Sequence, residues 1–230
     1  DTWIMAGVLV ANSITSTLGA LEVLVTDEYR GISKDFMVSP LKRWQLVLGY
    51  ILSTWVVGVI TGFIVFVVSQ AYIVMRGGEL ISVASAAKVL GLILVNVLAF
   101  SAFNFLIVSF FKTSAAFSTF STLVGTLIGF VTGVYVPIGV LPDIIQKFVL
   151  LVPATHGASI MRQLYMSSSM ASAFQGAPAE LASEFSRIYG VTLHLNGSAL
   201  TIPTMLAYIA ITGAAFFVLS IIRLMFKKAS

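Results

Sequence analysis

Five long apolar runs divide the chain, and short polar stretches separate them. Each run offers about 20 or more predominantly apolar residues, which is the length that a helix needs to cross the hydrocarbon of a bilayer. Unpaired backbone is too costly in lipid, and the runs lack the alternating pattern of barrel strands, so we expect five transmembrane helices. They are predicted at residues 3–25, 44–75, 83–111, 114–136 and 202–226.

A different pattern fills residues 137–200, between the fourth and fifth runs. Its first part is too apolar for a free loop, and Pro137, Pro142 and Pro153 break it. We expect short helices there that lie at the outer membrane surface or dip into it and return. Its second part, from about Ser167 to Ser198, is rich in Ser, Ala and Gly, which indicates a solvated outer subdomain.

Composition places the chain among integral membrane proteins. Of its 230 residues 58% are hydrophobic and only 10% are charged, whereas about a quarter of the residues of soluble proteins are charged. Cysteine is absent, which excludes disulfides and thiolate metal sites. His156 and His194 stand far apart without neighbouring ligands, so we expect no metal or acid–base role for them.

The net charge of +4 is modest, and its distribution indicates membrane topology rather than nucleic-acid binding. Lys and Arg accumulate on the cytoplasmic side of membrane proteins. With five spans, three basic regions share one side, which predicts a cytoplasmic C-terminus and an external N-terminus. No signal peptide precedes Asp1, so we expect that an earlier span is missing from this sequence. The basic residues are Arg30, Lys34, Lys42, Arg43, Lys112, Arg223, Lys227 and Lys228.

The segment 26–40 combines many charges with a proline between two apolar runs. We interpret it as a helix along the inner face of the membrane. Its apolar knob, Phe36 to Val38, and its charged side chains would contact a cytoplasmic partner. Pro40 would end this helix and set the angle at which the next span enters the membrane. The alternative is a surface helix in a basic loop without a partner.

This segment resembles the coupling helix of the ABC-2 type transporter permeases, the type V exporters. Those proteins carry Glu-x-Arg-Gly, then Ser/Thr-Pro, a basic residue and a Gly. The chain matches with Glu28, Arg30, Gly31, Ser39, Pro40, Arg43 and Gly49, and it departs from the family pattern at residues 34–38. Pro137, Pro142 and Pro153, followed by Arg162, match the break and the short outer helices of that family.

The resemblance implies an all-α polytopic membrane protein, a helical bundle of the ABC-2 permease type with a cytoplasmic coupling helix and short outer re-entrant helices. The first span of the family has no counterpart here. The family's contacts with the ATPase carry over to the residues that match or fill the coupling segment. These are Glu28, Arg30, Gly31, Lys34, Asp35, Phe36, Met37, Ser39, Pro40 and Arg43.

The resemblance also implies a function: the permease subunit of an ATP-binding cassette exporter in a bacterial or archaeal inner membrane. The sequence has no Gly-x-x-x-x-Gly-Lys-Ser/Thr loop, so ATP and Mg would belong to a separate ATPase subunit and the permease itself would have no catalytic site or cofactor. A second permease copy or a paralogue and membrane lipid are the other expected partners. The substrate would be a drug, an antimicrobial peptide or a lipid-like amphiphile, as in a multidrug exporter.

Several residues inside the spans allow two interpretations. Glycines four residues apart let helices approach closely, either within one subunit or at a dimer or translocation seam. Asn96 and Asn104 would form interhelical hydrogen bonds or line a polar path. Glu22 would either pair with Arg30 or Lys34 or reach the headgroups, or it would relay protons. The glycines are Gly58, Gly62, Gly125, Gly129 and Gly133.

Other classes of membrane protein remain as alternatives. An ion-coupled secondary transporter typically holds ionisable residues near the midplane of the membrane, and these spans are nearly free of them. An intramembrane enzyme would need a nucleophile and a base at useful spacing, which the sequence does not offer. The last alternative is a non-transporting membrane anchor that assembles partners.

Overall fold

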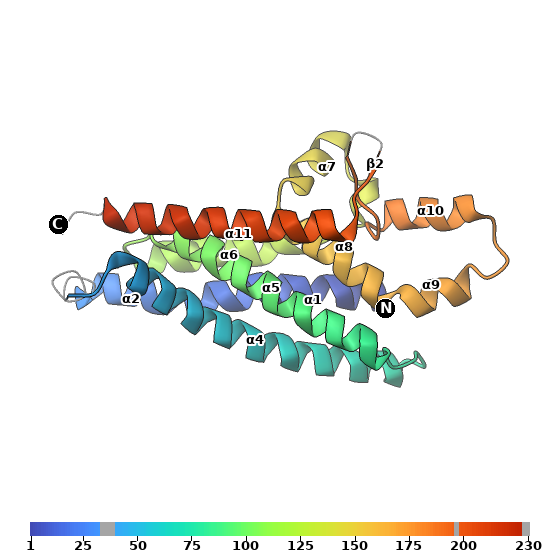
Figure 1. The fold of residues 1–230 in the computed structure, drawn as a ribbon, viewed down its shortest axis with the longest axis horizontal. Coiled ribbons are helices and arrows are strands. Elements are labelled where there is room, and N and C mark those ends of the chain that lie inside the picture. The colour runs from blue at the N-terminus through green and yellow to red at the C-terminus, as the bar shows by residue number, and fades with distance from the viewer. Residues whose placement is uncertain (33–39, 196–197, 227–230) are drawn as a thin grey trace.

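A computed structural model of the chain describes residues 1–32, 40–195 and 198–226. Long helices lie side by side in a bundle (Figure 1). In the described part, five helices or broken helices are long and apolar enough to cross a membrane. The expected all-α polytopic bundle is therefore confirmed. The long helices are α1 (Thr2–Ala20), which continues into α2 (Glu22–Tyr29), α4 (Arg43–Met75), α5 (Val83–Val108), α6 (Ser114–Val131) and α11 (Ile202–Met225).

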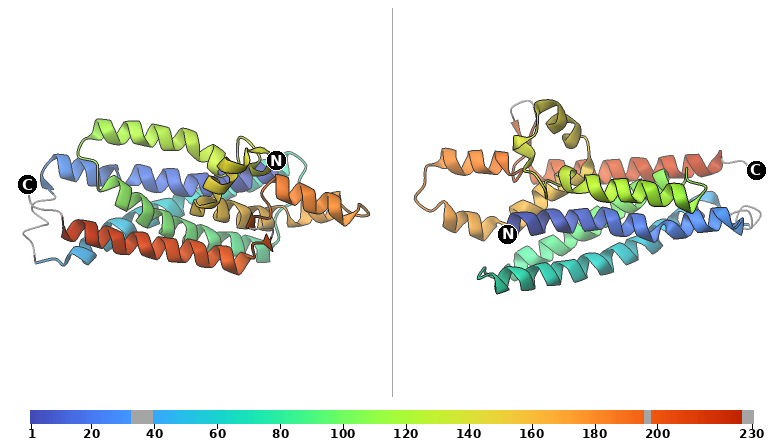
Figure 2. Two further views of the ribbon diagram at one scale, coloured as in Figure 1. Left: turned by 90° about the horizontal axis from the view of Figure 1, so that it is seen from above. Right: turned by 180° about the vertical axis from the view of Figure 1, so that it is seen from behind.

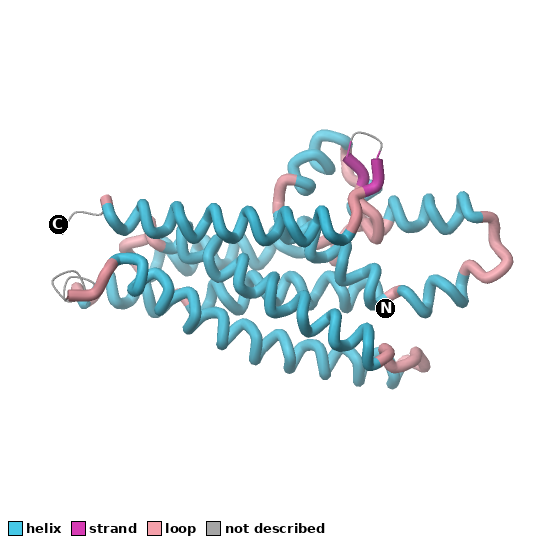
Figure 3. The backbone as a smooth tube through the Cα atoms, viewed as in Figure 1, coloured by secondary structure: helices cyan, strands magenta, loops and turns pink. Residues whose placement is uncertain are grey.

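Short elements fill the chain between α6 and α11. A 3-10 helix, η1 (Ile138–Val140), is followed by α7 (Asp143–Leu150), α8 (Pro153–Tyr165), α9 (Ser167–Ala173) and α10 (Ala179–Ile188). The strands β1 (His194–Leu195) and β2 (Ser198–Ala199) form a small antiparallel pair with His194 opposite Ala199. Figure 3 shows this pair beside α7, next to the start of α11.

The two ends of the bundle differ in what they carry. At the α2 end lie α2, the start of α4 and the C-terminal end of α11 (Figure 1). At the α7–α10 end lie the start of α1 and all the short elements, with the α9–α10 pair projecting beyond the long helices. The segment of short helices that the sequence predicted is thus separated along the bundle from α2, which begins the charged segment.

Helices α1 and α5 form the centre of the bundle. Helix α1 packs against α4, α5, α6 and α8, and α5 also packs against α11. Buried apolar side chains from these helices form one cluster toward the α7–α10 end, with Leu9 and Val97, and another toward the α2 end, with Leu18 and Phe105. Helix α6 lies at the edge of the bundle beside α1, as the two views of Figure 2 show.

Two of the predicted spans end earlier than expected. The third predicted span, 83–111, stops at Val108, and the fourth, 114–136, stops at Val131. Gly133 explains the second case because its φ of 68° is left-handed. The amide of Gly133 donates to Phe130 O and the amide of Val134 to Gly129 O, which is the Schellman pattern that closes a helix.

The first span is not a continuous helix. It breaks at Leu21, where the backbone has φ −80° and ψ 0°, and continues as α2. Leu21 itself is fully buried, so the break lies inside the packed bundle and not in a free loop. The sequence pattern does not reveal this break, because a single charged residue, Glu22, follows Leu21 and the apolar run then continues through Val25.

Candidate functional site

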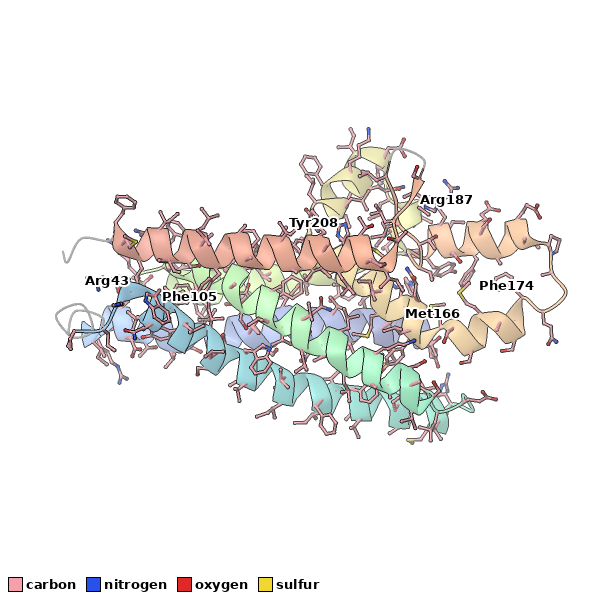
Figure 4. All side chains as sticks on the ribbon, viewed as in Figure 1. Arg43, Phe105, Met166, Phe174, Arg187 and Tyr208 are labelled. Atoms are coloured by element: carbon pink, nitrogen blue, oxygen red, sulfur yellow. The ribbon has the colours of Figure 1, made fainter. Side chains whose placement is uncertain are left out.

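Helix α2 holds the beginning of the charged segment against the bundle. The hydroxyl of Tyr50, on α4, donates a hydrogen bond of 2.6 Å to Oδ2 of Asp27. Hydrogen bonds to an ionised carboxylate are among the strong ones in proteins. The N-terminal part of the segment is therefore fixed to α4 as well as to α1, and Arg43 begins α4 at the same end of the bundle, as labelled in Figure 4.

Gly31 ends α2 through its backbone conformation. Its φ is 78°, and a Cβ added there would meet no heavy atom within 4 Å. The amide of Gly31 donates to Glu28 O at 3.2 Å. The glycine is thus required for the left-handed conformation and not for space. Glu28, of the predicted contact residues, lies on α2, and Arg30 follows it as the C-terminal cap, with an exposed side chain.

The structure describes only part of the rest of the predicted coupling segment. Pro40 is exposed and lies just before α4. The first turn of α4 is closed by Gln45, whose Oε1 accepts a 2.9 Å hydrogen bond from the amide of Lys42. Five predicted contact residues lie outside the described part of the chain, and they are Lys34, Asp35, Phe36, Met37 and Ser39.

Gly58 and Gly62 bring α4 close to its neighbours. A Cβ at Gly58 would lie 2.5 Å from Cγ1 of Val97 on α5 and 2.9 Å from Cγ2 of Thr17 on α1. A Cβ at Gly62 would lie 2.9 Å from Cγ2 of Ile93. These distances are shorter than contacts between carbon atoms allow. Helix α4 therefore packs this closely against α1 and α5 only because both residues lack a side chain.

The three glycines of the fourth predicted span serve different purposes. Gly125 has open space around it, whereas Gly129 lies under the ring of Tyr135. Gly133 follows the end of α6, and a Cβ there would lie 2.9 Å from a guanidinium nitrogen of Arg162. Their regular spacing therefore corresponds to no single surface, and only Gly125 faces away from the rest of the chain.

One face of α6 carries exposed hydroxyl groups. Ser118, Thr119, Thr122 and Thr126 are exposed. The three threonines donate to backbone carbonyls one turn earlier in the same helix, at 2.9 to 3.0 Å. Because their donors are already bonded, these side chains can lie in a membrane or against a second protein without unsatisfied protons. With Gly125, they form what we call the α6 face.

Arg162, which the sequence comparison noted only as the residue that follows the three prolines, is a buried charge. It is fully buried in α8 and donates from one terminal nitrogen to the carbonyls of Thr132 and Gly133 at the end of α6. Its guanidinium also lies 5.2 Å from the ring centre of Trp3. The available signal was that Arg162 is the only Lys or Arg in the helix that Pro153 opens. It indicates a charge held by protein atoms and not by water.

Asn104 and Asn96 behave differently. The Nδ2 of Asn104 donates to Ile14 O at 3.0 Å and to Oγ1 of Thr17 at 2.8 Å, so it joins α5 to α1. Asn96 is fully buried, and its side chain has no hydrogen-bond partner in the described part of the chain. It lies against Gly157 of α8. The interhelical interpretation thus holds for Asn104 and not for Asn96.

The remaining predictions concern prolines and ionisable residues. Pro137 and Pro142 precede η1 and α7, and Pro153 opens α8, which turns by 90° from α7. Proline suits such positions because it supplies a helical φ where no amide donor is needed. Glu22 is exposed and forms no ion pair with Arg30; Lys34 lies outside the described residues.

The histidines take part in ring and loop contacts. His156 stacks on Tyr208, with ring centres 4.4 Å apart, and His194 lies in β1. Within the described residues, no three His, Cys, Asp or Glu side chains are grouped as a metal site would require. The charged segment at the α2 end and the α6 face are therefore the candidate functional regions.

Comparison with known proteins agrees with this arrangement. The family model described as ABC-2 family transporter protein matches residues 3–222. Neither the curated proteins nor the solved structures include a match to this chain. The match covers the charged segment, the α7–α10 end and all of the long helices except the first residue of α1 and the last three of α11. The chain is therefore a multi-pass membrane protein that belongs to the ABC-2 transporter family.

Proposed function

We propose that the chain is the permease subunit of an ATP-binding cassette exporter and is coupled to a separate ATPase through residues 26–40. Permeases of the ABC-2 family in general associate with an ABC ATPase. The observation that carries the proposal is the α2 region, where Asp27 is bonded to Tyr50 of α4 and Gly31 turns the chain out of α2. A force applied to this segment would reach both α1 and α4.

The charge distribution supports an orientation with the α2 end in the cytoplasm. Eight of the thirteen Lys and Arg residues lie in the stretches of sequence at or next to the ends of the long helices on this side. Four of the nine acidic residues lie in the same stretches. The other end has as many acidic as basic residues. The whole net charge is thus on the α2 side, as the preference of Lys and Arg for the cytoplasm requires.

The transport path would lie between two permeases. The α6 face is exposed, carries small and hydroxylated side chains, and adjoins α1, which continues into the coupling segment. Small residues allow close helix contact, and back-bonded hydroxyls tolerate both apolar and polar neighbours. ATP hydrolysis on the partner would move α1 and α6 together and open this seam. Its mixed lining suits an amphiphile such as a drug, a peptide or a lipid-like molecule.

The first experiment tests coupling with a single backbone change. We expect Gly31→Ala to insert normally and to bind the ATPase, but to lose most of the permease-dependent stimulation of ATP hydrolysis. Alanine in the left-handed region costs about 1–2 kcal/mol, which lowers the population of the docked conformation by roughly five- to thirty-fold. The measurement is ATP hydrolysis by the co-purified complex in nanodiscs. Pro40→Ala provides a second variant in the same segment.

Gly91→Ala is the matched control. Gly91 also has open space around it, but it lies in α5 without a left-handed backbone, so its substitution should leave stimulation unchanged. Equal stimulation in Gly31→Ala and Gly91→Ala complexes would contradict the coupling role. A chain that never co-purifies with an ATPase would instead favour the ion-coupled transporter or the anchor.

A further inference from the structure

A cavity of about 460 Å³ lies at the α7–α10 end, between α7, α8, the β1–β2 pair and α11. It is outside both regions used in the proposed function. Its walls are mostly apolar, and its size falls within the range of about 300–1,000 Å³ that is usual for small-molecule sites. The residues used below to describe it are Lys147, Phe148, Leu151, His156, Leu200 and Tyr208.

The polar wall of the cavity is fixed by contacts within the protein. The hydroxyl of Tyr208 donates to Leu151 O at 2.7 Å, which joins α11 to the end of α7. His156 stacks on the same tyrosine ring, and its Nδ1 lies 3.4 Å from Val152 O. Figure 4 labels Tyr208 on the side of α11 that faces α7. This wall is therefore preorganised before any ligand arrives.

Lys147 supplies the charge of the site. Its side chain is exposed on α7, and among the described residues it forms no ion pair, including with Asp143 one turn earlier. The ammonium group thus lies at the border of an apolar cavity with no carboxylate bound to it. A ligand that complements this arrangement has an apolar body and an anionic head.

The position of the cavity relative to the membrane favours a lipid as its ligand. Tyr208 lies in the second turn of α11, which is long and apolar enough to span the bilayer. On α7 the side chains of Ile144, Phe148 and Leu151 are 69%, 65% and 67% exposed. Short helices with such an apolar side lie at the boundary between headgroups and acyl chains. The cavity therefore opens where a lipid phosphate meets the hydrocarbon.

We propose that this cavity binds one membrane lipid with an anionic headgroup, taken from the leaflet on the α7–α10 side. An acyl chain occupies the space between Phe148, Leu200 and Tyr208, and the phosphate meets Lys147. The site requires only that the chain spans a membrane, and it does not depend on the proposed exporter function. Bound lipid would connect α7 to α11 in addition to the Tyr208 hydrogen bond.

The test uses photoreactive lipids and the full chain with any subunits that purify with it. The protein is placed in phosphatidylcholine vesicles that contain a trace of phosphatidylglycerol or phosphatidylcholine with a diazirine on the acyl chain. After irradiation, mass spectrometry quantifies the label on peptides from α7 and from the start of α11. We expect phosphatidylglycerol to label these peptides about five-fold more than phosphatidylcholine, since a basic residue near an anionic lipid contributes about this factor.

Variants distinguish the contribution of the Lys147 charge to lipid labelling from the contribution of the cavity space. Lys147→Gln should reduce labelling by phosphatidylglycerol to the phosphatidylcholine level, and Lys147→Arg should preserve the difference. Lys88→Gln is the control, because Lys88 is also exposed near the same leaflet but borders another groove. It should leave labelling of these peptides unchanged. Leu200→Trp, which fills the cavity, should abolish labelling by both lipids.

Four labelling results and one competition result would overturn the proposal. The labelling results are equal labelling by the two lipids, unchanged labelling in Lys147→Gln, unchanged labelling in Leu200→Trp, and absence of label in the wild type because a second protein chain covers the cavity. Soluble glycerol phosphate should not compete. If it abolishes labelling at millimolar concentration, the site binds small anions and not lipid. Size-exclusion profiles of all variants verify that they fold.

Discussion

At the scale of single residues, Arg162 joins three parts of the chain that are distant in sequence. One of its terminal nitrogens donates to the carbonyls of Thr132 and Gly133 at the end of α6, and its guanidinium lies over Trp3 of α1. The carbonyl end of a helix carries partial negative charge, which a cation stabilises. Glycines surround the guanidinium because a Cβ at Gly7, Gly133 or Gly190 would lie 3.3 Å or less from it.

Arg162→Ala should therefore destabilise the folded protein strongly. The change removes the donors of two buried carbonyls and leaves a cavity, and together these effects should lower the free energy of unfolding by about 3 kcal/mol or more. The measurement is the melting temperature in detergent, followed by size-exclusion chromatography. Arg187→Ala is the comparison, because Arg187 is an exposed arginine on α10. Similar melting of the two variants would show that Arg162 contributes little.

At the scale of elements, the sequence predicts the helices better than their ends and contacts. Five apolar runs were sufficient to predict five spans. The break at Leu21 and the end of α6 at Val131 depend on local backbone conformation, which apolar patterns do not encode. The 90° turn between α7 and α8 was indicated only by its prolines. The surroundings of Arg162 come from residues up to 159 positions away, which is the separation in sequence from Trp3, so no local pattern could reveal them.

The contact between α1 and α5 offers a quantitative test at this scale. A double-mutant cycle with Asn104→Ala and Thr17→Val isolates the hydrogen bond between the two side chains. We expect a coupling energy of about 0.6–1.7 kcal/mol, as for other interhelical hydrogen bonds in membranes. Unfolding in detergent with added denaturant provides the four stabilities. Additive effects of the two substitutions would exclude a direct bond.

Thr61→Val serves as the control for that cycle. Thr61 is also a threonine in a long helix, but it donates only to carbonyls of its own helix, Val57 O and Gly58 O. Combined with Asn104→Ala, it should show no coupling. Any coupling there would indicate that threonine substitutions affect stability through the helix itself and not through α1–α5 packing.

At the scale of the whole molecule, the proposed function has two permeases meet at the α6 face. The chain has no cysteine, so single cysteine variants give an unambiguous cross-linking experiment. We expect Thr122→Cys to form a disulfide between two copies under mild oxidation when both permeases of the complex are this chain. A disulfide needs Cα atoms about 4.4–6.8 Å apart. Non-reducing electrophoresis of membranes measures the dimer.

Val67→Cys is the control for cross-linking. Val67 is exposed on α4, which does not belong to the α6 face, and it should give no dimer. Dimers from Val67→Cys alone would place the seam on α4. Equal dimer formation by both variants would indicate random collision in the membrane.

The hydrogen bond between Trp3 and Tyr189 has a consequence for biogenesis. Trp3 Nε1 donates to Tyr189 O at 2.8 Å across 186 positions of the chain. At a synthesis rate of about 5–20 residues per second, α1 waits roughly 10–40 s in the bilayer before this partner is made. During that time Ser13 and Thr17 can bond carbonyls of their own helix, Leu9 O and Ser13 O. The hydroxyls of α1 therefore have acceptors before α4, α5 and α6 are made, whereas the indole of Trp3 waits until Tyr189 emerges from the ribosome.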